Sequence, residues 1–328
     1  MKPRVLITQK IFPEIKQRLS RSCSVKEIPV TLPVGSRRLT REGRNCEGLL
    51  SFLTDGIDAA LLKKLPRLRI IANFAVGYNN IDIAAATECG IMVTNTPSVL
   101  TEATADLTWG LMLSVVRHLP QADRFMREGR FKGWQPDLFL GRDLSGKTLG
   151  IIGLGRIGRA VARRALASGM RIAYTARKRD DEAEMELGAA AMSLEDLLKT
   201  SDVVTIHAPL SPSTGHLIGR RELNLMKPGS YLINTARGPI IDEKALVAVL
   251  KSRRLAGAAL DVYEDEPRLA PGLAKLPNVV LSPHLGSATV ETRLKMAEAA
   301  AGNLLDFFAR RTPPNCVNPE ILKNPGKS

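Results

Sequence analysis

The chain has 328 residues, of which 44% are hydrophobic and 24% are charged, which is an ordinary globular balance and enough sequence for two domains. It has no apolar run long enough to span a bilayer, and its four cysteines are scattered without a C-x-x-C pair, which argues against a membrane protein, a disulfide framework and a metal site. The net charge of +14 is spread along the chain and aromatic residues make up only 4%, so we expect anionic small molecules rather than nucleic acid as partners. Reduced thiols and the lack of a signal-peptide core predict a cytoplasmic protein.

The first hundred residues alternate short apolar runs with helix-like segments. The expected elements are strands at 5–7, 48–51 and 69–72, and helices at 11–20 and 58–65. Such alternation predicts a small parallel α/β sheet. Ligands lie at the carboxyl ends of the strands in such sheets, so the loops at 51–55 and 73–82 are candidate binding loops. A plain turn is the alternative interpretation of each loop.

A long helical pattern at 101–118 is expected to lead from one domain to the next. It is followed by an aromatic cluster at 121–140, which contains Phe125, Phe131, Trp134 and Phe139. Such a cluster suits a dimer arm, and local packing is the alternative.

The segment that carries the clearest chemistry is a glycine loop. An apolar run at 148–152 reads as a strand, and a helix-like segment follows at 159–166. Between them, Gly153, Gly155 and Gly158 have the G-x-G-x-x-G spacing. The first glycine permits a tight turn, the second lets a pyrophosphate approach the backbone, and the third lets the helix pack closely on the strand. The loop predicts a dinucleotide site, with a glycine-rich turn that binds nothing as the alternative.

The residues after the next strand, at 170–174, bear on which dinucleotide binds. An NAD site needs an acidic residue there to accept from the ribose hydroxyls. Here Ala176, Arg177 and Lys178 follow, and no acid occurs before Asp180. Arg177 and Lys178 suit a 2′-phosphate, so NADP is the favoured cofactor. NAD stays open, because Asp180 could reach the ribose.

The later strands each end in a polar group. They are expected at 202–210, 231–238, 257–262 and 279–284, and a long helix at 290–310 precedes a proline-rich tail, 313–328, that should pack loosely. Arg237, Glu266 and His284 would converge at the strand ends. Reduction of a 2-oxo acid needs a cation for the carboxylate and carbonyl, and a proton donor held in one tautomer by a carboxylate. Each could instead be an ordinary surface charge or a capping residue.

Four motifs together make the chain resemble the D-isomer-specific 2-hydroxyacid dehydrogenase family over nearly its whole length. They lie at 153–158, 234–238, 259–267 and 282–286. Two further segments, 73–82 and 314–319, are similar to the glyoxylate/hydroxypyruvate reductase branch. One departure is Asn79, where many relatives carry aspartate.

The resemblance implies an α/β fold with two Rossmann-like parallel-sheet domains. A dinucleotide-binding domain, 101–286, would be inserted in a flavodoxin-like substrate domain made of 1–100 and 287–328. It further implies a homodimer, and reduction of a small 2-oxo acid such as glyoxylate or hydroxypyruvate to the D-2-hydroxy acid by NAD(P)H.

The resemblance also implies roles for individual residues. Arg237, Glu266 and His284 form the implied catalytic set, with His284 as the proton donor. The implied substrate contacts are Leu53, Val76, Gly77, Arg237 and His284. The implied cofactor contacts are Gly153, Leu154, Gly155, Arg156, Ile157, Gly158, Ala176, Arg177, Lys178, Thr235, Ala236, Arg237, Asp261, His284 and Gly286.

Two alternative functions fit the same fold. One is a short 3-phosphoglycerate dehydrogenase. The other is a dinucleotide-sensing corepressor, against which the intact Arg237, Glu266 and His284 argue.

Overall fold

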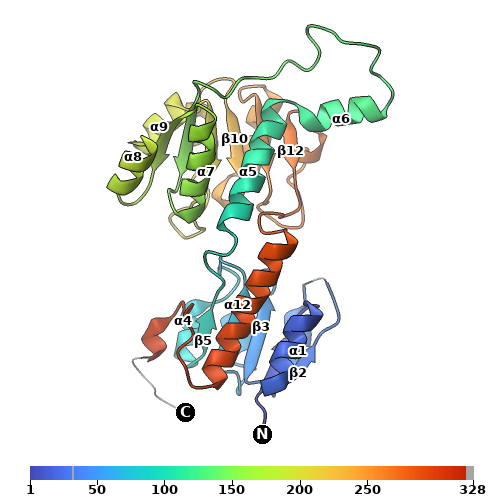
Figure 1. Cartoon of the computed structure of the whole chain (residues 1–328), viewed down its shortest axis with the longest axis vertical. Coiled ribbons are helices and arrows are strands. Elements are labelled where there is room, and N and C mark those ends of the chain that lie inside the picture. Colours follow the sequence, from blue (N-terminus) through green and yellow to red (C-terminus); the bar gives the residue numbers. More distant parts are fainter. Residues whose placement is uncertain (32, 323–328) are drawn as a thin grey trace. The chain divides into compact units, whose positions relative to one another are not determined.

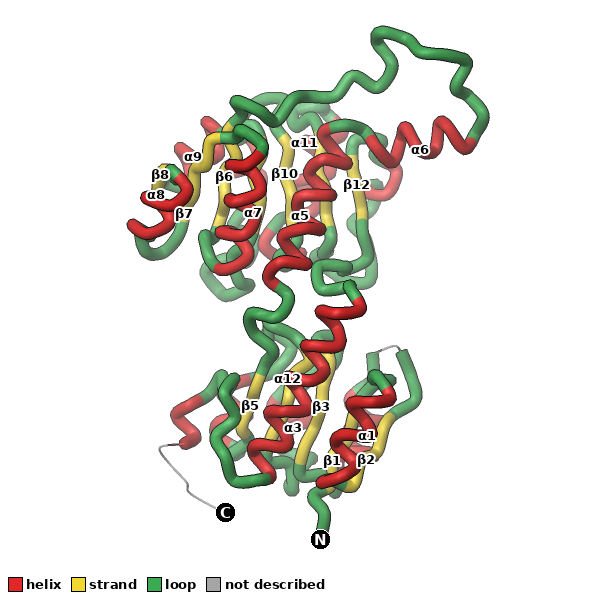
Figure 2. The backbone as a smooth tube through the Cα atoms, in the orientation of Figure 1, coloured by secondary structure: helices red, strands yellow, loops and turns green. Residues whose placement is uncertain are grey.

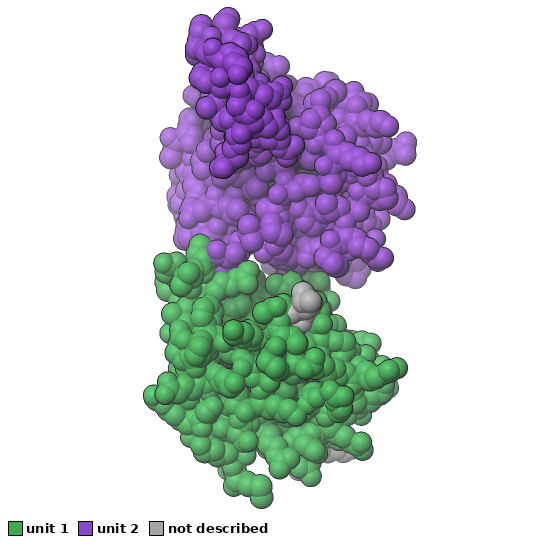
Figure 3. Space-filling view, turned by 90° about the vertical axis from the view of Figure 1, so that its right-hand side faces the viewer, with its two compact units in different colours: residues 1–100, 289–328 green, residues 101–288 purple. Residues whose placement is uncertain are grey.

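The computed structural model describes residues 1–31 and 33–322. The chain forms two compact units, coloured separately in Figure 3: unit 1 is Met1–Leu100 with Thr289–Ser328, and unit 2 is Thr101–Ala288. Within the described ranges, no helix is both long enough and apolar enough to cross a membrane.

Unit 2 is built on a seven-stranded sheet in the order β12-β11-β10-β9-β6-β7-β8, and every strand pair in it is parallel. In chain order the strands are β6 (Thr148–Ile152), β7 (Arg171–Thr175), β8 (Ala190–Ala191), β9 (Val203–Ile206), β10 (Tyr231–Asn234), β11 (Gly257–Leu260) and β12 (Val279–Leu281). The order reverses between β6 and β9, which is the switch point where doubly wound sheets bind their ligands.

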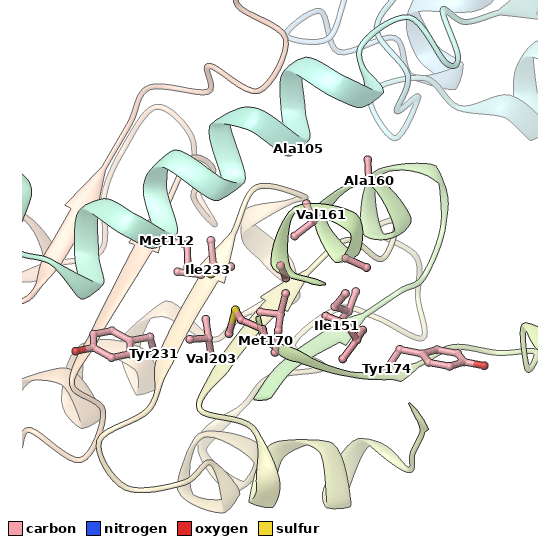
Figure 4. Close-up of a cluster of buried hydrophobic side chains, with 14 of the residues drawn as sticks. Ala105, Met112, Ile151, Ala160, Val161, Met170, Tyr174, Val203, Tyr231 and Ile233 are labelled. Carbon is pink, nitrogen blue, oxygen red and sulfur yellow. The ribbon is translucent and has the colours of Figure 1, made fainter. Parts of the chain in front are cut away.

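Helices cover both faces of this sheet, as the backbone trace in Figure 2 shows. The helices are α5 (Thr101–Val116), α6 (Leu119–Arg127), α7 (Arg156–Ala167), α8 (Asp181–Leu187), α9 (Leu194–Thr200), α10 (Arg220–Leu225) and α11 (Glu243–Lys251), with 3-10 turns η1 (Gly238–Ile240) and η2 (Leu273–Lys275). Successive strand side chains alternate between two cores: Ile151 packs with α5 and α7, and Ile152 packs with α9 and α11. Figure 4 shows the first core, in which Met112 and Val161 lie among strand residues such as Ile233.

Unit 1 contains a smaller parallel sheet in the order β2-β1-β3-β4-β5. Its strands are β1 (Arg4–Ile7), β2 (Ser24–Glu27), β3 (Gly48–Phe52), β4 (Ile70–Phe74) and β5 (Met92–Thr94), and its helices are α1 (Pro13–Ser22), α2 (Ser36–Gly43), α3 (Ala59–Leu62), α4 (Ile83–Glu88) and α12 (Val290–Phe308), with the 3-10 turn η3 (Pro319–Leu322). Helices α1 and α12 bury one face, and α2, α3 and α4 bury the other. The predicted fold class, two parallel α/β domains with the glycine-loop domain inserted in a flavodoxin-like one, is confirmed.

Most predicted helix boundaries differ by one to three residues from those in the structure, and two of these differences have a clear physical reason. Helix α7 begins at Arg156 rather than at residue 159, because Gly155 is its N-cap and Arg159 N already donates to Gly155 O at 2.9 Å. Helix α3 ends at Leu62 rather than at residue 65. The backbone tightens there into i→i+3 turns before Pro66, which cannot continue a helix.

The prediction of a loosely packed C-terminal tail is wrong for the part of the tail that the structure describes. Asn318 is fully buried and links the C-terminal segment to the residues around β5 in the same unit. Its Oδ1 accepts from Val93 N at 2.8 Å, and its Nδ2 donates to Ile91 O at 3.0 Å. Buried amide hydrogen bonds of this kind are not readable from proline content. The remainder of the predicted tail, 323–328, lies outside the described residues.

The aromatic cluster at 121–140, which comprises most of α6 and the loop after it, extends away from the sheet of unit 2 (Figure 1). Helix α6 buries none of its side chains, and Trp134 in the loop after it is 83% exposed. Phe125 and Phe139 pack edge to face with ring centroids 5.4 Å apart, which closes the base of the segment.

Candidate active site

The glycine loop follows β6 at the switch point of the larger sheet. Gly153 has φ +95°, and a Cβ there would lie 2.7 Å from Ala208 N. A Cβ on Gly158 would lie 2.3 Å from the carbonyl oxygen of Gly153, so α7 approaches the loop as closely as only glycine permits. A Cβ on Gly155 would meet no atom within 4 Å. The loop thus combines a tight turn, close packing and open space, which fits the pyrophosphate of a dinucleotide.

The first turn of α7 directs N–H donors, which have no acceptor among the described residues, to this open space. Its N-cap, Gly155, has no side chain to accept from them. The backbone N–H groups of 156–158 precede the first intrahelical bond, made by Arg159, and so have no acceptor within the helix. Three such N–H groups at the positive end of a helix favour an anion.

The loop after β7 is closed by a polar network. Tyr174 Oη donates to Glu184 Oε1 at 2.7 Å and accepts from Asp180 N at 2.8 Å. Arg179 also binds Glu184, with Nη2 2.6 Å from Oε2. Arg179 is thus engaged in holding the loop, whereas residues 176–178 are exposed at its tip.

Asp180 is engaged by its neighbours in the same unit. Arg159 Nη2 donates to Asp180 Oδ1 at 2.7 Å, and Ala183 N donates to it at 3.1 Å, where Asp180 caps α8. These two donors hold the pKa of Asp180 below its ordinary value against the opposing effect of burial. Among the described residues, Arg177 and Lys178 have no ion-pair partner.

Arg237 lies in a turn after β10 that is held by side-chain hydrogen bonds. Asn234 accepts from Ala236 N at 3.0 Å and donates to Arg237 O at 2.9 Å. Thr235 is 8% exposed and its hydroxyl lies 2.8 Å from that of Thr108 in α5. Burial lowers the pKa of the Arg237 guanidinium, and the nearby Glu266 carboxylate opposes that effect.

Glu266 and His284 form a hydrogen-bonded pair. The His284 Nδ1 lies 3.0 Å from Glu266 Oε2, and the two side chains are 28% and 33% exposed. Burial favours a higher pKa for Glu266, but the bond from His284 and its charge, with Tyr263 N and Arg237, hold that pKa below its ordinary value. An ionised carboxylate only accepts, so His284 Nδ1 carries a hydrogen and Nε2 is left to exchange a proton.

Asp261 anchors the backbone on which His284 stands. It is fully buried at the end of β11, and its carboxylate accepts from Ser282 Oγ at 2.6 Å, Leu285 N at 2.7 Å and Gly286 N at 2.8 Å. Burial raises the pKa of Asp261, and these donors oppose the rise. His284 itself has φ +55°, a left-handed conformation held by the bond from its N–H to Asp261 O at 2.9 Å.

In unit 1, the two loops predicted separately form one structure. Leu53 follows β3, and Val76 and Gly77 follow β4; all three are partly exposed. Asn80 Nδ2 donates to Phe52 O at 3.2 Å, so the loop after β4 is tied to the end of β3. The structure therefore brings the expected substrate residues of this unit together.

Comparisons with known proteins decide the family. Residues 109–286 match the description "D-isomer specific 2-hydroxyacid dehydrogenase, NAD binding domain". The chain is 50% identical over 328 residues to a glyoxylate reductase of Aeropyrum pernix, covering 98% of each. The chain belongs to the D-isomer specific 2-hydroxyacid dehydrogenase family. The resemblance inferred from the motifs is thereby confirmed.

Solved structures agree with this membership. A protein from Thermus thermophilus superposes with a TM-score of 0.90 at 45% identity, over 96% of this chain and 99% of that one. An NADPH-dependent glyoxylate/hydroxypyruvate reductase from Sinorhizobium meliloti, in complex with NADP and malonate, gives 0.87 at 37% identity, over 97% of both chains.

Sequence reasoning missed the residues that hold the acidic turn of this dehydrogenase. The buried Glu243 accepts from Glu264 N at 2.8 Å, and Glu264 accepts in return from Glu243 N at 3.2 Å. His216 Nε2 lies 2.6 Å from Glu264 Oε1, so this histidine has a definite partner. The sequence signal was available only in part: three acids in 264–266 suggest a solvated turn rather than a fastened one.

Proposed function

We propose that this chain reduces glyoxylate, and hydroxypyruvate as a related substrate, to the D-2-hydroxy acid with NADPH as hydride donor. The observation that carries this proposal is the 50% sequence identity, over 98% of each chain, to the glyoxylate reductase of Aeropyrum pernix. The Glu266–His284 pair beside Arg237 supports the same chemistry, because the three side chains supply a proton donor, its orienting carboxylate and a cation.

In this mechanism each residue has one task. Arg237 binds the carboxylate of the 2-oxo acid and polarises its carbonyl oxygen. His284 gives the proton on Nε2 to that oxygen as charge develops there, and Glu266 stabilises the imidazolium before the transfer and keeps Nδ1 protonated. When bound, the dinucleotide supplies the hydride that adds to the carbonyl carbon. The backbone N–H groups of Val76 and Gly77, with Leu53 beside them, hold the substrate carboxylate in unit 1.

The cofactor would be held along the carboxyl edge of the larger sheet. The pyrophosphate would lie on 153–158, the adenosine end against 176–178, and the nicotinamide end against 235–237, Asp261, His284 and Gly286. Asp261 serves this end mainly by fixing the loop that contains Gly286. Residues 101–286 are thus the proposed cofactor domain, and 1–100 with 287–328 the proposed substrate domain.

The preference for NADPH rests on the loop after β7. Asp180, the acid that could accept from an NAD ribose, is already bound to Arg159 and Ala183 N. Arg177 and Lys178 are exposed and can meet a 2′-phosphate, and a well-placed charged hydrogen bond is worth about 1.5–3 kcal/mol before screening by salt. We expect kcat/KM to favour NADPH, and Arg177→Ala to remove most of the difference. Equal use of NADPH and NADH by the wild type would refute this assignment.

A homodimer is the proposed assembly, with the exposed segment after α6 as the contact. Its large apolar side chains include Phe131, Trp134 and Leu140, which are 45%, 83% and 69% exposed. Light scattering should give twice the chain mass, and a smaller mass for Trp134→Ala combined with Leu140→Ser.

A steady-state assay with glyoxylate tests the main proposal. His284→Ala should lower kcat by on the order of a hundredfold or more and leave cofactor binding intact. Preference of the wild type for 3-phosphoglycerate would favour the short dehydrogenase instead. Tight cofactor binding without turnover of any 2-oxo acid would favour a dinucleotide-sensing corepressor.

A further inference from the structure

The loop after β4 has an unusual arrangement of backbone bonds. Three consecutive carbonyl oxygens accept hydrogen bonds from residues in β4 or directly after β5. Ala75 O accepts from Thr96 N at 2.9 Å, Val76 O from Asn95 Nδ2 at 2.8 Å, and Gly77 O from Asn73 Nδ2 at 2.9 Å.

This arrangement fixes the direction of the amides that follow each carbonyl. In a trans peptide the N–H points opposite to the C=O of the same unit. The N–H groups of Val76, Gly77 and Tyr78 are therefore directed away from the strand ends. No described residue accepts a hydrogen bond from any of the three, so they form a row of free donors.

The two asparagines that hold the carbonyls are themselves fixed. Asn73 is fully buried in β4, and its Oδ1 accepts from Ser51 Oγ at 3.1 Å. Asn95 is 8% exposed directly after β5, and its backbone O accepts from Asn303 Nδ2 at 3.1 Å. The Asn73 side-chain amide is therefore held in one orientation, and the backbone from which the Asn95 side chain extends is fixed.

We infer, on the basis of the proposed reduction of a 2-oxo acid, that Asn73 and Asn95 are positioning residues for the substrate carboxylate, and that Tyr78 N–H is a third donor to it beside those of Val76 and Gly77. The asparagines touch no substrate atom. They hold the Val76 and Gly77 carbonyls inward, so that the donors meet the carboxylate without reorganising when it binds.

The test compares Asn95→Ala with Asn278→Ala. Asn278 is a matched control in unit 2, since it is 4% exposed and its Nδ2 donates to Leu250 O and Ala256 O, each at 3.2 Å. Asn95→Ala frees the Val76 peptide to rotate, so KM for glyoxylate should rise about three- to tenfold, as expected for one lost hydrogen bond. The affinity of oxalate for the enzyme–NADPH complex should fall by the same factor. The Kd of NADPH should not change.

Asn95→Asp adds a second measurement in a side chain of the same shape. Its carboxylate would face Val76 O with an acceptor, so KM should rise further than in Asn95→Ala while the melting temperature stays close to that of Asn95→Ala. The inference is overturned if Asn95→Ala keeps the wild-type KM and oxalate affinity, or if Asn278→Ala raises KM as much. A wild type that binds oxalate but does not reduce glyoxylate refutes the proposed function alone. In that case a loss of oxalate affinity in Asn95→Ala still supports the positioning role.

Discussion

Replacing Gly158 by alanine should destabilise unit 2, whereas replacing the nearby Gly155 by alanine should not. The added Cβ would lie 2.3 Å from the carbonyl oxygen of Gly153, where ordinary contacts begin at 3.4 Å. The obstacle is backbone, so the N-terminus of α7 must move away from the loop by about 1 Å. Overpacking of this kind costs about 1–3 kcal/mol, partly offset by the better helix propensity of alanine.

Because the contact is with backbone, which cannot turn aside, the cost lies at the upper end of that range; after the offset we expect Gly158→Ala to lose about 2 kcal/mol, and the unfolding transition of unit 2 to fall by roughly 4–8 °C. Differential scanning calorimetry without cofactor measures this shift. Gly155→Ala is the control: its Cβ meets no atom within 4 Å, so the transition should move by less than about 3 °C. Its methyl group would occupy the proposed pyrophosphate space, and the Kd of NADPH, measured by fluorescence titration, should rise at least about tenfold. An unchanged transition in Gly158→Ala, or wild-type affinity in Gly155→Ala, would refute the reasoning.

Three further changes test the charges of unit 2. Glu266→Gln should lower kcat about ten- to a hundredfold with the Kd of NADPH unchanged, because the His284 imidazolium loses its anionic partner; equal pre-steady-state rates in both proteins would contradict this role. Asp202→Asn should cost about 1–3 kcal/mol at pH 7 by urea unfolding, because Lys227 and a backbone amide hold the pKa of Asp202 below 3.8 despite its burial. The difference from wild type should disappear as the pH falls below 3.8 through that lowered pKa, and a constant difference would exclude the linkage. Burial lowers the pKa of His207 from 6.5 to about 3, so only the unfolded chain gains a proton at this residue as the pH falls from 6.5 to 5. His207→Gln should therefore reduce the loss of folding free energy between pH 6.5 and 5 by at most about 2 kcal/mol. The same loss in both proteins would show that His207 is not held in its neutral form by the folded chain.

Most residues of the proposed cofactor site could be predicted from local patterns in the sequence. The strand before the glycines, the spacing of Gly153, Gly155 and Gly158, and the absence of an acid before Asp180 are all properties of neighbouring residues. The strand-end positions of Arg237 and His284 could likewise be predicted, since parallel strands end at one edge of a sheet.

The bonds between distant residues could not be predicted in this way. Nothing near Asp180 in the sequence indicates that Arg159 binds it, and Asp261 reaches a loop more than twenty residues later. The same limitation explains the wrong prediction for the C-terminal segment, where Asn318 binds residues more than two hundred positions earlier, among them Thr87, Ile91 and Val93. Side-chain amides that bind backbone carry no periodic signal.

The insertion of unit 2 within unit 1 also sets an order of events during synthesis. The five strands of the smaller sheet are made before unit 2, but one of their faces is covered by α12, with Met296, Ala300 and Leu304, which is made after it. Unit 2 is continuous and holds its whole core by residue 288. At about 5–20 residues per second, its translation delays the completion of unit 1 by roughly 10–40 s. The strands of the smaller sheet must therefore be kept from aggregating throughout this interval.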